Sequence, residues 1–238
     1  FGGTVNAKYV SVPFCGDDAI DTDQGYQGKM QFVYVMIGKD GHHGTEMDSK
    51  YDGTPRSFPQ MYNALFVSQL NQTVASVSTD DTSLAVMRLR EGTGGEFGNI
   101  IITNNGYYGV YSSDCGTETR TQTVQTSGTM DYLWFSSNNI IYHVGSNGFQ
   151  FSLASGCTWS PSSPSAMSVD PELVMMSQQA TEDVSFLDPR PIAGGAAFDN
   201  LDSNPGDGFF DATTYKGAFS ATDLWLTGWS YLAESGLI

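Results

Sequence analysis

The 238-residue sequence predicts an all-β protein, and its composition, its short apolar runs and its lack of helical periodicity lead to this fold class. Only 15% of the residues are charged while 13% are aromatic, unlike the composition of helical bundles. Runs rich in Val, Ile, Tyr and Phe recur between Gly, Asn, Asp and Ser, as strands do between turns. No segment of about 12 residues or more has a helical period, so the helices of a doubly wound α/β sheet are not expected.

The predicted strands come in clusters roughly 20–25 residues apart, near the coil length of solenoid repeats. The pairs Asn104-Asn105 and Asn138-Asn139 each adjoin an Ile-rich run and predict polar turns that stack along a solenoid. Two Asn-Gly dipeptides, at 105–106 and 147–148, favour an antiparallel sandwich instead, because they are typical of tight hairpins. The pattern leaves a sandwich, a barrel and a parallel solenoid open. The clearest predicted strands are residues 30–37, 62–67, 84–90, 99–103, 107–111, 132–136 and 140–144.

The predicted strand at 84–90 has two distinct faces. Period two places Met87 and Leu89 on one face and Arg88 and Arg90 on the other. In a solenoid, the apolar pair is expected to face the core and the arginines to face solvent. The acidic partners expected for the arginines are Glu91 or Glu96.

The chain carries 10 Lys and Arg against 26 Asp and Glu, a formal net charge of −16. This charge argues against nucleic acid as a partner, because phosphate binding needs a basic surface. It also argues against a polybasic membrane anchor, and the longest apolar run, residues 32–37, is too short to span a bilayer. The acidity and the abundance of Gly, Ser, Thr and Asn favour a secreted or cell-surface protein.

The three cysteines, Cys15, Cys115 and Cys157, form no Cys-x-x-Cys metal pattern. An odd number leaves at least one free thiol or an intermolecular bond. One bridge, Cys115–Cys157 in the first place, is compatible with an oxidising compartment, and the pairing stays open at this point.

Several short segments, spread over most of the chain, are distinctive in combination. They are 1–9 (FGGTVNAKY), 16–21 (GDDAID), 25–32 (GYQGKMQF), 44–48 (GTEMD), 89–95 (LREGTGG) and 215–219 (YKGAF), with Trp225 and Gly228-Trp229 beyond the last. Together they resemble a family of secreted bacterial right-handed parallel β-helix proteins, most of them without assigned function. The resemblance implies β-helix coils over residues 1–187 that continue before residue 1. It brings no catalytic residues.

The chain changes character after the Asp-Pro-Arg-Pro sequence that begins at residue 188. A short helix is expected over 223–235, with Asp223 as its cap and with Trp225 and Trp229 on its apolar face. An open last coil exposes apolar core and unpaired backbone, so residues 188–238 are interpreted as a helix-containing cap that covers it. The alternative is a docking surface for another subunit.

The densest acidic cluster predicts a metal site. Calcium takes about six to eight oxygen ligands and suits acidic loops that contain glycine. The loop that contains Asp21 and Asp23 places two carboxylates on one side, and stacked coils would add residues from the next coil. A solvated acidic turn is the alternative. The predicted calcium ligands are Asp17, Asp18, Asp21, Asp23, Glu46 and Asp48.

A histidine pair and a second acidic segment are also candidate metal sites, and we interpret both as loops without a metal. His42 and His43 point to opposite sides of an extended chain, and no Cys or third nearby His completes a zinc site. The second acidic segment contains Asp199, Asp202, Asn204, Asp207 and Asp211.

We expect an extracellular or cell-surface β-helix protein with a structural or adhesive role, with assembly into a filament or larger surface structure as one outcome. The expected partners are further copies of the chain, other surface proteins and polysaccharide. Two alternatives stay open. One is a calcium-dependent polysaccharide lyase or hydrolase, in which Arg88 or Arg90 takes a proton near Asp17 and Asp18. The other is a non-catalytic carbohydrate-binding module. No catalytic residue is assigned, and calcium is the one cofactor considered.

Overall fold

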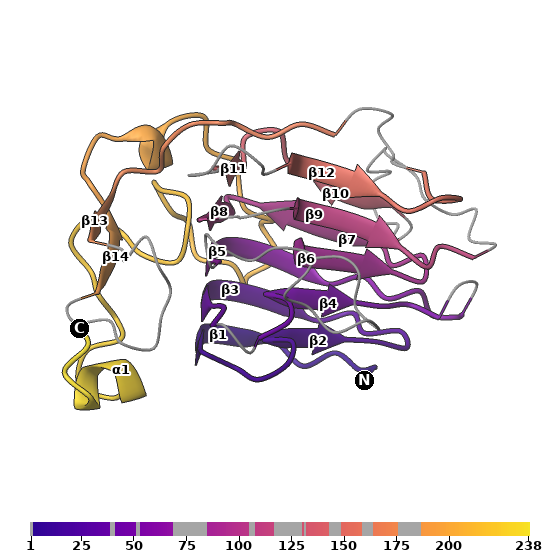
Figure 1. Ribbon diagram of the computed structural model, residues 1–238, viewed down its shortest axis with the longest axis horizontal. Coiled ribbons are helices and arrows are strands. Elements are labelled where there is room, and N and C mark those ends of the chain that lie inside the picture. The colour runs from indigo at the N-terminus through magenta and orange to yellow at the C-terminus, as the bar shows by residue number, and fades with distance from the viewer. Residues whose placement is uncertain are drawn as a thin grey trace.

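The chain forms a parallel β-helix, as predicted, in which successive coils stack on one another (Figure 1). The computed structural model describes residues 2–38, 41–50, 53–68, 85–104, 108–116, 130, 132–142, 149–158, 164–175 and 187–238. In the part of the chain that these ranges cover, no helix is long and apolar enough to cross a membrane.

Two sheets of parallel strands build the solenoid, and the chain passes from one sheet to the other in each coil. The first sheet contains β1 (Ala7–Pro13), β3 (Lys29–Met36), β5 (Gln60–Val67), β7 (Gly95–Gly98), β8 (Ile101–Thr103), β10 (Leu133–Phe135) and β11 (Ile140–Ile141). The second sheet contains β2 (Ile20–Thr22), β4 (Thr45–Met47), β6 (Ala85–Arg90), β9 (Tyr108–Ser113) and β12 (Phe149–Leu153).

The expected hairpins do not form between the strands that flank the two Asn-Gly dipeptides. The dipeptides themselves lie outside the described residues. β8 pairs in parallel with β11 and β5, and β9 pairs in parallel with β6 and β12. These strands therefore bond to the coil below or above them rather than to their neighbours in the sequence, which supports the solenoid and excludes the sandwich.

One corner of the coil is made by a column of residues with left-handed backbone. Strand pairing places Tyr9, Phe32, Asn63 and Asn99 at equivalent positions of four successive coils, with φ angles of 58°, 58°, 54° and 53°. Each left-handed residue turns the chain, so the first sheet covers two faces of the solenoid. Asparagine tolerates this conformation better than most other residues with a Cβ.

The Asn pairs predicted to stack are only partly found at this corner. Asn139 continues it, because its side chain accepts from the Ile100 amide (2.8 Å) and donates to the Phe97 carbonyl (2.9 Å) of the coil below. Asn104 also has a positive φ, of 56°, but lies at another turn. Asn138 instead donates to Asp202, and Asn105 lies outside the described residues.

The interior of the coils is apolar and tightly filled. Met87 and Leu89 are 0% and 1% exposed and point inward, whereas Arg88 and Arg90 lie on the outer face, as predicted. The first sheet contributes Val33, Val35, Ala64, Phe66, Ile100 and Ile102 to the same core.

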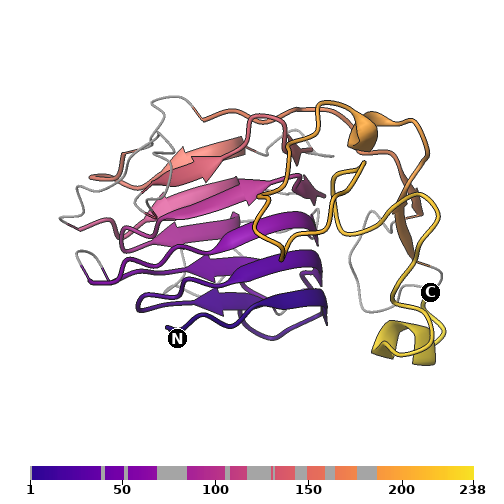
Figure 2. The same cartoon turned by 180° about the vertical axis from the view of Figure 1, so that it is seen from behind.

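A second apolar cluster lies outside the solenoid, between the first sheet and the C-terminal segment. Tyr34, Met36, Leu65 and Ile101 point outward from β3, β5 and β8 and are almost fully buried. The C-terminal segment runs along this flank, beside the stacked coils (Figures 1 and 2). Its contributions to the cluster include Leu187, Ala197, Ala218, Phe219, Leu226 and Leu232.

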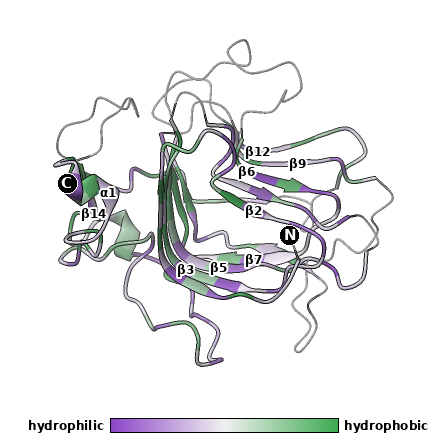
Figure 3. Ribbon diagram, turned by 90° about the horizontal axis from the view of Figure 1, so that it is seen from below, coloured by the Kyte–Doolittle hydropathy of each residue, from purple (hydrophilic) through white to green (hydrophobic). Residues whose placement is uncertain are grey.

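The C-terminal segment therefore covers a side of the solenoid, where it had been expected to cover the last coil. Figure 3, a view from below, places it outside the first sheet and away from the second. The side cover is needed because the second half of each long strand is apolar on both faces. The antiparallel pair of β13 (Leu173–Met175) and β14 (Asp188–Pro191) joins residues from both sides of the expected boundary at 187/188.

The expected helix over 223–235 is much shorter. A 3₁₀ helix occupies Ala196–Phe198, and the one α-helix of the described chain, α1, spans Tyr231–Glu234. The Ser230 side chain accepts from the Ala233 amide and caps α1, a role that had been expected for Asp223. Residues 225–229, which include Gly228, form turns, so the helix begins only after Ser230.

One disulfide joins neighbouring coils. Cys115 follows β9 and Cys157 follows β12, and the two are bonded, which is the pairing considered first from the sequence. Cys15 is a free, half-buried thiol.

The side cover yields a prediction about two aromatic residues. Phe219 is 1% exposed and packs edge-on against Tyr34, whereas Trp229 is 54% exposed, contrary to the buried position expected for it. Phe219→Ala should lower the free energy of unfolding by roughly 3–5 kcal/mol, because it leaves a cavity over the first sheet. Trp229→Ala should cost less than about 1 kcal/mol. Urea unfolding of both variants measures this, and equal losses would contradict a cover built around Phe219.

Candidate functional site

The outer face of the second sheet carries a ladder of charged side chains. Asp21 lies opposite Glu46, and Glu46 lies opposite Arg88, on β2, β4 and β6. Arg88 Nη1 lies 3.1 Å from Glu46 Oε1. Stacking of coils thus brings together residues that are far apart in the sequence.

Arg90 is the centre of this charged face. It lies 3.0 Å from Glu46, 3.2 Å from Asp48 and 2.9 Å from Asp114. The expectation of Glu96 as an ion-pair partner is wrong, because Glu96 lies on the first sheet. Burial alone would lower the pKa of Arg90, but the carboxylates around it raise that pKa, so the guanidinium keeps its proton.

The six predicted calcium ligands do not form one site. Five of them belong to three groups of possible ligands, two of which share Asp18, and within each group the ligand atoms lie within 4.8 Å of one another. The groups are Asp17, Asp18 and His42; Asp18, His43 and Glu46; and Asp23, Asp48 and Glu91. Asp21 belongs to none of them, and Glu91 was not among the predicted ligands.

Asp48 has a strongly raised pKa. Burial raises the pKa of Asp48 to about 7. The charge of Arg90 opposes this rise, and the neighbouring carboxylates add to it. Oδ2 of Asp48 contacts Arg90, while Oδ1 is buried without a hydrogen-bond partner. A cation beside Asp23, Asp48 and Glu91 would compensate this carboxylate, so the residues fit calcium by their chemistry.

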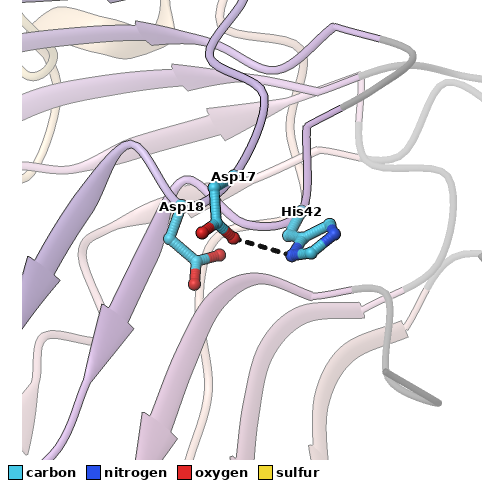
Figure 4. Close-up of side chains that lie close together, drawn as sticks. All are labelled: Asp17, Asp18 and His42. Carbon is cyan, nitrogen blue, oxygen red and sulfur yellow. Dashed lines mark ion pairs between the residues drawn. The ribbon is translucent and has the colours of Figure 1, made fainter. Parts of the chain in front are cut away.

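The two adjacent histidines each pair with a different aspartate. His42 Nδ1 lies 2.9 Å from Asp17 Oδ1, the ion pair drawn in Figure 4, and His43 Nδ1 lies 2.7 Å from Asp18 Oδ1. Burial would raise the pKa of Asp18, but the hydrogen bonds and charge of His43 outweigh it and lower that pKa. Both histidines thus take part in loop contacts.

The second acidic segment forms contacts of its own with the first sheet. Asp207 and Asp211 each lie 2.6 Å from a lysine, Lys29 and Lys8 respectively. Among the described residues, no cluster of side chains that could hold a metal ion includes a residue of this segment. Its acidic side chains fasten the C-terminal segment to the solenoid.

A pocket of about 440 Å³ lies on the outer face of β5, β7 and β10, and we call it the flank pocket. Gln60, Glu96 and Trp134 stand next to one another in it, because strand register pairs Glu96 with both of the others. Segment 202–205 forms the opposite wall. The pocket is lined by the aromatic side chains Phe58, Tyr62, Tyr132 and Trp134 and by the carboxylates of Glu96 and Asp202.

Glu96 is the buried polar centre of the flank pocket, at 5% exposed. It accepts hydrogen bonds from Gln60 Nε2 (3.0 Å), from Tyr132 Oη (2.8 Å) and from Tyr62 Oη. Burial, and then the hydrogen bond to Glu96, raise the pKa of Tyr62, so that phenol stays a donor.

The wall of the flank pocket is held by reciprocal hydrogen bonds to the solenoid corner. Asn99 Nδ2 donates to the Asp202 carbonyl and Asn99 Oδ1 accepts from the Asp202 amide, both at 2.9 Å. Asn138 Nδ2 donates to Asp202 Oδ1 at 2.8 Å. The sequence did not predict this pocket, because residues far apart in the chain build it. The one local sign of it was Glu96, a charged residue between Gly95 and Phe97 in a predicted β-helix coil.

Comparison with known proteins gives one family. A family model described as a pectate-lyase-like beta helix domain matches residues 1–141. No curated protein and no solved structure gives a significant match to the chain.

Asp48 gives stability a pH dependence of defined sign. Because folding raises the pKa of Asp48 to about 7 from 3.8, the folded state holds a proton that the unfolded state releases in this range. The contribution of Asp48 therefore lowers stability as the pH rises from 3.8 to 7. Asp48→Asn should become more stable relative to wild type over this range, as urea unfolding at several pH values measures. Asp223→Asn, at an exposed position, is the control, and a difference independent of pH for Asp48→Asn would contradict the expectation.

Proposed function

We propose that this chain, which belongs to the pectate-lyase-like beta-helix domain family, is an extracellular adhesive protein that binds polysaccharide in the flank pocket without cleaving it. The observation that carries the proposal is the combination of four aromatic rings and two carboxylates around one open pocket. Aromatic faces pack on the apolar faces of sugar rings, and carboxylates accept from sugar hydroxyls. The pocket volume is in the range of small-molecule sites.

The position of the flank pocket suits a long polymer. It opens on the outside of three stacked coils, so a polysaccharide can enter and leave without threading. Gln60 and Ser203 add polar groups at its edge. These features support binding of a sugar within a chain as well as at its end.

The charged face of the second sheet supports the lyase alternative less well. A lyase of this kind would use Arg88 or Arg90 to take a proton, and proton abstraction requires a base that releases its own proton near the working pH. Arg90 is surrounded by Glu46, Asp48 and Asp114, which raise its pKa. Arg88 is paired with Glu46 as well.

An extracellular location is part of the proposal. The Cys115–Cys157 bond supports it, because disulfides persist in oxidising compartments. The net charge of −16 supports solubility there. Self-association into a filament stays a prediction, which light scattering of the purified protein tests.

Calcium binding by Asp23, Asp48 and Glu91 is a second part of the proposal. Their ligand atoms lie within 4.8 Å of one another, and one oxygen of Asp48 is buried without a partner. A calcium ion there would stabilise the stacked second sheet. This set replaces the wider set of six residues expected from the sequence.

Polysaccharide binding predicts a specific loss in the flank pocket. Trp134→Ala should weaken the affinity for a retained polysaccharide by about tenfold or more, because the sugar loses its stacking face. Affinity electrophoresis against neutral, acidic and amino-containing polysaccharides measures this. Trp229→Ala, which changes an exposed indole outside the pocket, is the control and should bind as wild type does. Retention by no polysaccharide, or equal binding by the Trp134 variant, would refute the proposed function.

Calcium binding predicts a shift in thermal stability. Millimolar calcium should raise the melting temperature of the wild type, because a ligand of the folded state stabilises it by mass action. Asp23→Asn and Glu91→Gln should abolish the shift, and Asp17→Asn, in another group, should keep it. Differential scanning fluorimetry measures all four proteins. An unchanged melting temperature, or a shift lost only in the Asp17 variant, would contradict this site.

A further inference from the structure

We infer that the flank pocket selects a sugar that carries a free ammonium group, as in a polysaccharide that contains unacetylated hexosamine. The inference rests on the proposed function and adds the class of sugar. It comes from the charges of the pocket, which differ in sign from those of a site for acidic polysaccharides.

The first observation is the environment of Glu96. Its carboxylate is buried, and the groups that donate to it are an amide and two phenols, all neutral. Among the residues that the structure describes, no lysine, arginine or histidine forms an ion pair with it. A cationic group of a ligand would form an ion pair with Glu96 that these neutral donors do not supply.

The second observation is the aromatic lining. Tyr62 and Trp134 lie 6.4 Å apart between ring centroids, and Phe58 meets Tyr132 edge-on at 4.8 Å. A cation near the faces of such rings is attracted by their electron density, more strongly where water is displaced. The same rings can pack on the carbon face of a sugar, so the aromatic wall can contact both the ammonium group and the ring of an amino sugar.

The third observation is the sign of the remaining charges. Asp202 adds a second carboxylate from the opposite wall, and the described residues that line the pocket include no Lys or Arg. The charge of Lys216 reaches Asp202, but Lys216 is buried and its ammonium donates to the Asp199 carbonyl. A uronate would therefore meet two like charges, which disfavours acidic polysaccharides here.

A lysine side chain of a protein is the other carrier of the same group. The pocket favours the sugar because Gln60 and Ser203 offer polar partners that hydroxyl groups use and an aliphatic lysine stem does not. A lysine-containing peptide is therefore included in the experiment, and tight binding of this peptide would overturn the inference.

Isothermal titration calorimetry with three oligosaccharides of equal length tests the inference. The ligands are β-1,4-linked oligomers of glucosamine and of N-acetylglucosamine, and an oligomer of galacturonic acid. The glucosamine oligomer should bind at least about tenfold more tightly than the acetylated one, and the galacturonate should bind most weakly. Glu96→Gln should weaken binding of the glucosamine oligomer far more than binding of the acetylated oligomer, and should thus remove most of the preference for glucosamine. Glu234→Gln, at an exposed position on α1, is the matched control.

The outcomes separate the inference from the proposed function. Equal affinity for the two hexosamine oligomers would overturn the selection of an ammonium group and leave polysaccharide binding in place. Binding of none of these oligomers, with no retention by any polysaccharide, would refute both. A lysine-containing peptide that binds as tightly as the glucosamine oligomer would overturn the assignment to a sugar. If Glu96→Gln does not fold, as circular dichroism would show, Asp202→Asn provides the same comparison and should also reduce the preference.

Discussion

At the corner of the coil, the chain takes the left-handed conformation once in each turn. This corner positions the C-terminal segment and, with it, the flank pocket. Asn63 and Asn99 at this corner and the adjacent Gln31 use their side-chain amides to bind the backbone of the C-terminal segment. Gln31 exchanges two hydrogen bonds with Asp211, and Asn63 donates to the Tyr215 carbonyl. Because solenoid stacking repeats the corner at each level, these amides form a column that holds segment 202–215 against the flank. The residues that cover the outward apolar side chains, among them Ala197 and Phe219, lie on either side of this segment.

The flank pocket is a consequence of that attachment. The first sheet supplies Glu96 and Trp134, and the attached segment supplies Asp202 on the other side. Asn99 contacts both backbone groups of Asp202, so a residue of the solenoid corner fixes the width of the pocket. On the second sheet, charged residues neutralise one another in ion pairs between coils. The two outer faces therefore differ in chemistry: one offers an aromatic pocket with carboxylates, the other a network of ion pairs.

Local patterns predicted the parts of the fold that depend on one strand at a time. The alternation from Met87 to Arg90 gave the correct inner and outer faces, because period two is a property of any strand. Contacts between coils could not be read from the sequence, since they depend on register. Glu91 joins Asp23 and Asp48 only after three coils have stacked. In the same way, Phe219 and Trp229 look alike as apolar residues, and only the path of the C-terminal segment decides which of them is buried.

The central claim is that polysaccharide occupies the flank between the first sheet and the C-terminal segment, and hydrogen exchange with and without a bound oligosaccharide tests it most directly. The account predicts slower amide exchange on binding in β7, in β10 and in segment 202–205, with no change in β4 and β6. This pattern would locate the ligand independently of any substitution. Protection confined to the second sheet, around Glu46 and Arg88, would contradict the account and place binding on the charged face instead.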